Sequence, residues 1–308
     1  MRNRSIIVRF ALCGSLLFGC GIIILNFISH TQQLNDDFLI KKETKSIESI
    51  PTANTFIRHK NNPKSIITNT DYDYKSPSQP EKLNMNLSET DIPNVQIKVY
   101  NISITNNQNK NILVREAGQS NYHILLLHGE AFTSKIWWEI GALQFLSTWG
   151  YRAVTIDIPK KGNHSLPVTN DKQAVQWLKK LIQALELSNL VIVSASASGD
   201  LTLPYIFQLE KEQQLVRGFV PIAPVSTERR ALDYFRQINI PTLVVHAEDD
   251  SPFQPAYEIL IEIPNSEVLF MIDAGHDSYV DQPLFFLNGL RQFLYKVYRP
   301  IYKNSKWF

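Results

Sequence analysis

The chain has 308 residues, of which 44% are hydrophobic and 19% charged, and its formal net charge is +2. At roughly 150 residues per domain, this length allows two domains or one large one. The composition excludes a wholly disordered, collagen-like or coiled-coil chain. The small net charge, with no cluster of Lys and Arg, argues against nucleic-acid binding. The two cysteines are Cys13 and Cys20. Thiol catalysis and Cys-based zinc sites are therefore excluded for residues 21–308. We expect neither a metal nor a cofactor.

An apolar run of 19 uncharged residues covers positions 10–28. As a helix it spans close to the hydrocarbon thickness of a bilayer. Arg2, Arg4 and Arg9 precede the run, whereas acidic and basic residues are mixed after it. This bias predicts a single-pass type II signal anchor, with residues 1–9 in the cytosol and the bulk of the chain luminal or extracellular. The alternatives are a cleaved signal peptide, a buried core helix, or a domain that faces the cytoplasm.

A polar segment follows at residues 29–92. Of its 64 positions 17 are hydrophobic, 14 are Ser or Thr, and none is Gly. Such a segment has little apolar surface to offset the entropy of ordering its backbone. We therefore expect a flexible stalk, then one domain at 93–300 and a short tail at 301–308.

From about Val95 the pattern changes to short β-rich runs that alternate with helical stretches. Residues 95–104 and 111–115 predict an opening hairpin or meander. Apolar spacing at 172–187 predicts a helix with Asp171 as its N-cap, and a last helix follows Pro283. Fully apolar runs predict the strands of a parallel sheet that is covered on both faces: Tyr122–Leu127, Arg152–Ile158, Asn189–Ser194, Gly218–Ile222, Thr242–His246 and Glu267–Ile272. The predicted fold class is doubly wound α/β.

Ligands of such sheets bind at the C-terminal ends of the strands. Ser194–Gly199 follows one predicted strand, Glu248–Asp250 follows another, and His276 follows the last. A serine, then an acid, then a histidine at strand ends is the order of an α/β-hydrolase triad. The serine hydroxyl needs a base to remove its proton, and the base needs a carboxylate to hold its tautomer. The pattern therefore predicts nucleophilic catalysis.

Ser196 fits the nucleophile position best among three serines. The sharp turn at a nucleophile crowds the positions two before and two after it, and Ser196 has Ser194 and Ser198 there. Ser198 would place Asp200 at a crowded position, and Ser194 would place Ile192 there. Glycine is the usual residue at these two positions. Serine is also small, so Ser194 and Ser198 keep the turn sterically possible.

His276 is assigned as general base and acid, and Asp250 as the carboxylate that orients it. Glu248 and Asp249 compete with Asp250 for this role. Two backbone N–H groups should stabilise the oxyanion of the tetrahedral intermediate. We expect them to belong to Ala197, which follows the nucleophile, and Glu130, which follows a His-Gly turn.

From about residue 97 to 295 the chain resembles the α/β-hydrolase domain-containing protein 14 family, and within it the membrane-anchored A-type. The matching stretches are LLLHG at 125–129, GYRAVTIDIP at 150–159, S-x-S-x-S-G at 194–199, GFVPIAP at 218–224 and AGH at 274–276. The resemblance implies the α/β-hydrolase fold and places the family's triad on Ser196, Asp250 and His276. Serine in place of glycine around the nucleophile is itself a mark of that family.

The substrate class follows only from loop length. About twenty residues separate positions 222 and 242, too few for the large lid domain that many such hydrolases insert there. We predict an open site for small acyl esters or acyl-amides, and a serine hydrolase of carboxylesterase type that works through a Ser196 acyl-enzyme. The family resemblance adds lysine deacetylation as an alternative. A non-catalytic scaffold is the third reading, favoured by the acidic Glu130 and Asp200 near the elbow.

Overall fold

The computed structural model describes residues 66–68, 92–104, 111–159, 167–209 and 215–304. The chain divides after Asn61, and all the described residues lie in the second unit, Asn62–Phe308. The predicted anchor at 10–28 and most of the predicted stalk lie outside the described residues. Within the part that is described, no helix is long and apolar enough to cross a membrane.

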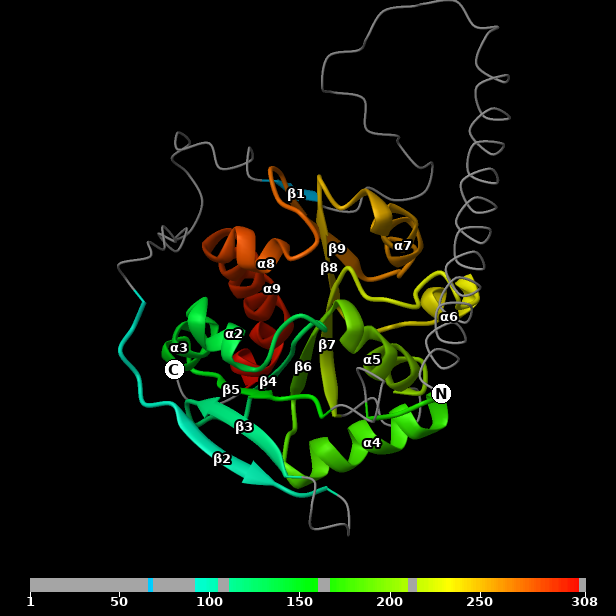
Figure 1. The fold of residues 1–308 in the computed structure, drawn as a ribbon. Coiled ribbons are helices and arrows are strands. Elements are labelled where there is room, and N and C mark those ends of the chain that lie inside the picture. The colour runs from blue at the N-terminus through cyan, green and yellow to red at the C-terminus, as the bar shows by residue number, and fades with distance from the viewer. Residues whose placement is uncertain (1–65, 69–91, 105–110, 160–166, 210–214, 305–308) are drawn as a thin grey trace, which may run out of the picture. The chain divides into compact units, whose positions relative to one another are not determined.

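The described residues form a nine-stranded sheet in the order β1-β9-β8-β7-β6-β4-β5-β3-β2 (Figure 1). Pairing is parallel from β1 through to β5. It is antiparallel where β3 joins β5 and where β2 joins β3, so the predicted opening hairpin is confirmed. The strands are β1 (Ile66–Thr68), β2 (Lys98–Ile102), β3 (Ile112–Ala117), β4 (His123–Leu127), β5 (Arg152–Ile156), β6 (Leu190–Ala195), β7 (Val216–Ile222), β8 (Thr242–Ala247) and β9 (Ser266–Met271).

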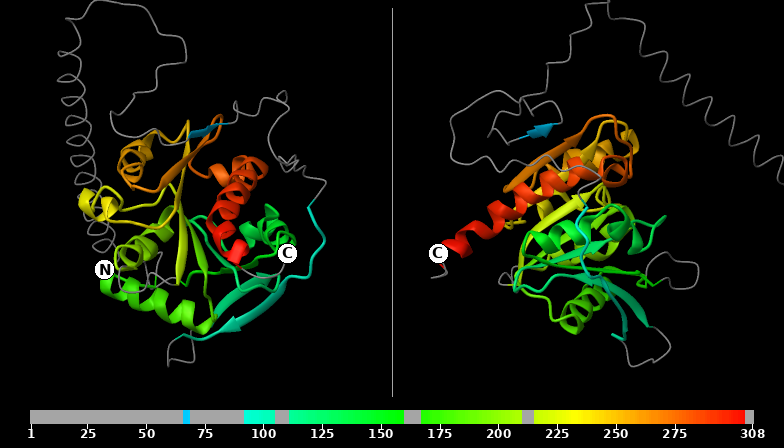
Figure 2. Two further views of the ribbon diagram at one scale, coloured as in Figure 1. Left: turned by 180° about the vertical axis from the view of Figure 1, so that it is seen from behind. Right: turned by 90° about the vertical axis from the view of Figure 1, so that its left-hand side faces the viewer.

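Helices cover both faces of this sheet. Successive residues of a strand point to opposite faces, and the apolar strands therefore present side chains that need burial on both faces. In β4, Ile124 and Leu126 join a core with α2, α3, α8 and α9, whereas Leu125 and Leu127 join a core with α4, α5, α6 and α7. Figure 2 shows α4 and α9 on opposite sides of the sheet. The helices are α2 (Lys135–Glu139), α3 (Ala142–Thr148), α4 (Asp171–Ala184), α5 (Gly199–Ile206), α6 (Leu232–Arg236), α7 (Gln254–Leu260), α8 (Ser278–Asp281) and α9 (Pro283–Asn304).

The start of α4 differs from the prediction by one residue. Asn170, not Asp171, is the N-cap: its backbone is extended, and its side chain accepts a hydrogen bond of 3.0 Å from the N–H of Gln173. Asp171 instead lies in the first turn and forms an ion pair with Arg230. Either residue can cap a helix, so the choice depends on where the backbone turns.

Strand β1 was not predicted and lies inside the segment expected to be a polar stalk. Its three residues pair with β9 at the edge of the sheet, with Ile66 opposite Val268. A run of three residues among polar neighbours is too short to show the two-residue period of a strand. The boundary placed at residue 93 stays a prediction.

The connection between β7 and β8 is short, as its sequence length predicted. Residues 223–241 hold α6 and turns, and this segment forms no lid domain. The C-terminal ends of β6, β7 and β8 are therefore not covered by an insertion at this point.

Candidate active site

Ser196 lies directly after β6, in a 3₁₀ turn that leads into α5. Its φ of 47° is in the left-handed region, which non-glycine residues rarely adopt. Such a strand-turn-helix lifts the middle side chain above the sheet, and Ser196 is partly exposed while Ala195 and Ala197 are buried. The N–H of Val225 donates to the Ser196 carbonyl at 3.0 Å, which ties the turn to the segment after β7.

The three residues predicted as a triad lie in hydrogen-bond contact. His276 Nε2 is 2.8 Å from Ser196 Oγ, and His276 Nδ1 is 2.9 Å from Asp250 Oδ2. An ionised carboxylate can only accept, so Nδ1–H donates to Asp250 and Nε2 is free to accept from the Ser196 hydroxyl. The Asp250 side chain is 4% exposed and that of His276 33%. A buried carboxylate therefore orients a histidine whose ring is partly exposed to solvent.

The same contacts set the basicity of His276. Its hydrogen bond with Asp250 raises the pKa of His276, against the opposing effect of burial. The negative charges of Asp250 and Asp277 act in the same direction as the hydrogen bond. These carboxylates favour the imidazolium, the form that a general base reaches after it has taken a proton.

Hydrogen bonds between two loops place the carboxylate of Asp250, and not that of Glu248 or Asp249, next to His276. The N–H of Asp249 donates to the Ala274 carbonyl at 3.0 Å, and the Glu248 carboxylate accepts from the N–H of Asp273 at 3.2 Å. Both alternative acids thus join the loop after β8 to the loop that carries His276. Asp250 is the next residue and is the one whose carboxylate meets the imidazole.

The serines on either side of Ser196 form a buried hydroxyl network. Ser194 Oγ is 3.0 Å from Ser198 Oγ and 2.7 Å from Thr202 Oγ1, and all three residues are fully buried. The Ser198 hydroxyl also donates to the Ala195 carbonyl at 2.8 Å. Hydroxyls here are satisfied, so small polar side chains replace glycine without a buried unpaired group. Ser198 points into this network, which leaves Ser196 as the serine that meets the base.

The His-Gly turn after β4 lies against Ser196. A Cβ added at Gly129 would be 3.3 Å from Ser196 Cβ, so only glycine allows this approach comfortably. His128 holds the turn: Nδ1–H donates to the Gly129 carbonyl at 2.7 Å, and Nε2 accepts from the N–H of Ile158 at 3.0 Å. The exposed side chain of Glu130 follows this turn. Its N–H and that of Ala197 stay the predicted oxyanion donors.

Asp200, the second acidic residue near the elbow, lies in the first turn of α5. A carboxylate is favoured there by the positive end of the helix dipole. The position therefore has a structural explanation that does not argue against catalysis.

Sequence reasoning missed two residues of the site. Thr202 completes the hydroxyl network from α5, and Phe253 stacks on His276 with ring centroids 4.3 Å apart. Neither residue type is diagnostic by itself, although Phe253 follows Asp250 closely in sequence. Among the residues that the structure describes, no group of three or more His, Cys, Asp or Glu side chains could hold a metal ion.

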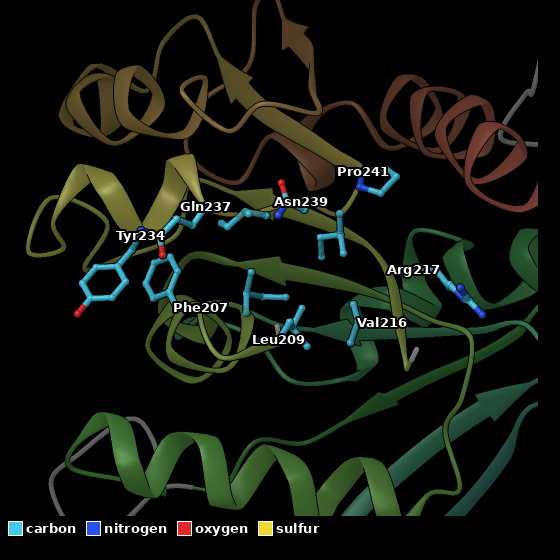
Figure 3. A pocket seen from close by; sticks show the side chains of 11 residues that line it. Phe207, Leu209, Val216, Arg217, Tyr234, Gln237, Asn239 and Pro241 are labelled. Atoms are coloured by element: carbon cyan, nitrogen blue, oxygen red, sulfur yellow. The ribbon is translucent and has the colours of Figure 1, made fainter. Parts of the chain in front are cut away.

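Figure 3 shows a pocket at the N-terminal ends of β7 and β8, whereas Ser196, Asp250 and His276 follow the C-terminal ends of β6, β8 and β9. The pocket is formed where α5 ends and where β7 and β8 begin, and Phe207, Val216 and Tyr234 are among the residues that line it. The pocket contains no residue of the predicted triad. Nucleophilic catalysis depends on hydrogen-bonded geometry and not on the size of a cavity, so the candidate active site is the arrangement of Ser196, His276 and Asp250.

The sheet and the residues at its strand ends define the class: the chain has the α/β-hydrolase fold. Solved structures with this fold include the predicted CIB-like hydrolase of Thermoplasma acidophilum (TM-score 0.57, 22% identity, 65% of this chain and 99% of that one). Another is the carboxylesterase CesB of Bacillus subtilis (TM-score 0.54, 16% identity, 66% of this chain and 93% of that one).

Curated relatives narrow the class to a family, although no protein-family model matches the chain. The chain is 39% identical over 174 residues to Protein ABHD14A of Mus musculus, covering 56% of this chain and 69% of that one. It is 36% identical over 211 residues to the Putative protein-lysine deacylase ABHD14B of Rattus norvegicus, covering 65% of this chain and 97% of that one. The chain belongs to the ABHD14 family.

Proposed function

We propose that the protein is a serine hydrolase that transfers acyl groups through a covalent intermediate on Ser196. The observation that supports this most is the continuous hydrogen-bond chain from Ser196 Oγ through His276 to the buried Asp250. A non-catalytic scaffold on this fold would not need a serine, a histidine and a carboxylate within hydrogen-bond distance of one another. The geometry therefore favours catalysis over a role in binding alone.

In the first half-reaction, Ser196 Oγ attacks the acyl carbon and His276 Nε2 takes the hydroxyl proton. Asp250 stabilises the imidazolium as it forms. The acyl oxygen becomes an oxyanion next to the N–H groups of Ala197 and Glu130, and losing one such donor typically costs about 3 kcal/mol. His276 then gives its proton to the leaving group. In the second half-reaction, His276 activates water, or another acceptor, which attacks the acyl-enzyme and frees Ser196.

Small acyl esters or acyl-amides are the substrates that the site fits best. The short segment 223–241 forms no lid that could enclose a long lipid chain. Acyl-lysine is the second candidate, because relatives that match over nearly their whole length are named putative protein-lysine deacylases. Rapid hydrolysis of long-chain triglyceride with little activity on acetyl or butyryl esters would contradict the small-acyl proposal. Comparing an acetyl ester with an acetyl-lysine peptide separates the two candidates.

We also propose that the protein is a membrane-anchored A-type member of the family, with the hydrolase domain luminal or extracellular. The apolar run at 10–28 and the arginines before it support this arrangement. A glycosylation reporter placed after residue 308 tests it. Modification is the expected result, and an unmodified, membrane-bound product would place the domain in the cytosol.

Covalent labelling by a fluorophosphonate probe tests the catalytic proposal. The wild-type protein should be labelled, Ser196→Ala should not, and Ser198→Ala should retain labelling because Ser198 lies in the buried network. Folding of each variant is checked by circular dichroism. Absence of labelling in folded wild-type protein would favour the scaffold.

A further inference from the structure

Phe253 and Asp250 belong to one turn and hold His276 from two directions. Phe253 ends the 3₁₀ helix Ser251–Phe253, and its N–H donates to the Asp250 carbonyl at 3.0 Å. The Asp250 carboxylate meets the edge of the imidazole at Nδ1. The Phe253 ring lies on the face of the same imidazole, with centroids 4.3 Å apart and planes 29° from parallel.

We propose that Phe253 is a positioning residue that covers one face of His276 and stabilises its imidazolium form. The inference rests on the proposed function, in which His276 must accept and return a proton. It assigns to the turn after β8 a second task besides presenting the acid.

Two physical effects support this role. The face of an aromatic ring carries partial negative charge and attracts a cation whose centre lies within about 6 Å of the ring centroid. The stack therefore favours the charged imidazole over the neutral one. It also fixes the plane of the imidazole about the Cβ–Cγ bond, while Asp250 fixes its edge. Together these contacts keep Nε2 directed at Ser196 Oγ, 2.8 Å away.

The charged groups that act on His276 are Asp250, from the loop after β8, and Asp277, at the start of α8. Phe253 differs from both because it stabilises the imidazolium without adding charge. Its contribution should therefore persist at high ionic strength, where the effect of the partly exposed Asp277 is screened.

A second histidine near this loop also stacks on an aromatic ring, but it contacts a side-chain amide where His276 contacts a carboxylate. His246 in β8 stacks on Tyr257 of α7 with centroids 4.3 Å apart and planes 10° from parallel. Its Nε2 is 2.9 Å from Gln254 Oε1, and burial lowers the pKa of His246. A stack alone thus does not make a base. Tyr257 provides a control for the general effect of removing an aromatic ring from a histidine near this loop.

Phe253→Leu removes the π face and keeps an apolar side chain, and Phe253→Tyr keeps the face. The readouts are the NMR titration of the His276 ring proton, assigned with His276→Gln, and the pH profile of kcat/KM for a small ester. Phe253→Leu should move the His276 titration and the acid limb of kcat/KM to lower pH by about half a unit. Phe253→Tyr should restore both, and Tyr257→Leu should leave both unchanged.

Unchanged titration and an unchanged acid limb in Phe253→Leu would overturn the proposal, since a space-filling role predicts that result. Phe253→Met repeats the test if the leucine variant does not fold. Failure of the proposed function gives a different result: folded wild-type protein would not be labelled at Ser196, while the ring-proton titration would still report whether the stack stabilises the imidazolium.

Discussion

The two ends of the sheet differ in what they contain. At the C-terminal ends of β6, β7 and β9, four non-glycine residues have left-handed backbones: Ser196, Ala223, Ser226 and Asp273. The hydrogen-bonded triad lies at this end. The N-terminal ends of β7 and β8 form the pocket of Figure 3, which is lined mainly by apolar and aromatic side chains. Among the described residues, four of the six non-glycine residues with left-handed backbones thus lie at the end of the proposed chemistry, and the other two, Glu186 and Asn189, precede β6 at the opposite end.

The pocket end has polar groups as well, but they are paired differently. Arg217, one of the residues that line the pocket, donates to Asn189 Oδ1 at 3.2 Å. The described residues that line the pocket include no serine, histidine or carboxylate. A hollow without a nucleophile and a base can hold a molecule but cannot perform acyl transfer. The comparison predicts that substitutions at the two ends will have very different effects.

The largest expected effect is the loss of the acid or the base. Asp250→Asn keeps the shape of the side chain but removes the charge that holds the His276 tautomer, so kcat/KM for a small ester should fall by about 10⁴. His276→Ala should reduce it at least as much. Tyr234→Ala, at the pocket end, should leave kcat/KM within about twofold. Equal losses of kcat/KM in variants at the two ends would contradict the assignment of the chemistry to the C-terminal ends of the strands.

A smaller effect, on stability, tests the hydroxyl network behind Ser196. Thr202→Val keeps the shape of the side chain but removes the hydroxyl 2.7 Å from Ser194 Oγ. Because Ser194 is fully buried, the free energy of unfolding should fall by about 1–2 kcal/mol, measured by urea denaturation. Thr148→Val removes an exposed hydroxyl that donates to the Phe145 carbonyl at 2.8 Å, and should change stability by less than about 0.5 kcal/mol. Similar losses in both variants would mean that burial of the network contributes nothing extra.

The hydroxyl network also marks the limit of sequence reasoning. The apolar strands and the Ser, acid, His order are local patterns, so the fold and the contact between Ser196 and His276 could be predicted from them. The partner of Ser194 is Thr202, which the turn brings back from the next helix, and no periodicity indicates that contact. Thus the sequence could show that serine fits on either side of Ser196, but not what the two flanking hydroxyls bind.

The choice among the three candidate acids also depends on a contact that the sequence does not show. Glu248, Asp249 and Asp250 are adjacent and chemically similar, and their assignment depends on which backbone groups face the loop after β9. The bond from the Asp249 N–H to Ala274 fixes that register. A pattern in one strand cannot specify its register against a strand that follows later in the chain.

The smallest expected effect is a shift in pH dependence that separates Asp277 from the triad itself. Asp277 raises the pKa of His276 through its charge, and burial raises the pKa of Asp277 itself. Because His276 acts as a base only when neutral, kcat/KM should fall as the pH drops through the raised pKa of His276. Asp277→Asn should move this acid limb to lower pH and leave the plateau unchanged. Asp273→Asn is the control, since Asp273 is an exposed carboxylate on the same loop.

The raised pKa of His276 also affects stability, but with the opposite pH dependence: kcat/KM falls as the pH drops, whereas the contribution of His276 to stability rises. A histidine whose pKa in the folded protein lies above its ordinary value of 6.5 stabilises the fold while it is protonated. That contribution is complete below the unfolded pKa and is lost as the pH rises through the folded pKa. Asp277→Asn should therefore reduce the stability gained when His276 is protonated, and should raise stability at alkaline pH, because burial raises the pKa of Asp277 and disfavours its ionised form in the fold. If urea denaturation instead shows an equal change at both extremes, Asp277 acts on the start of α8 and not on His276.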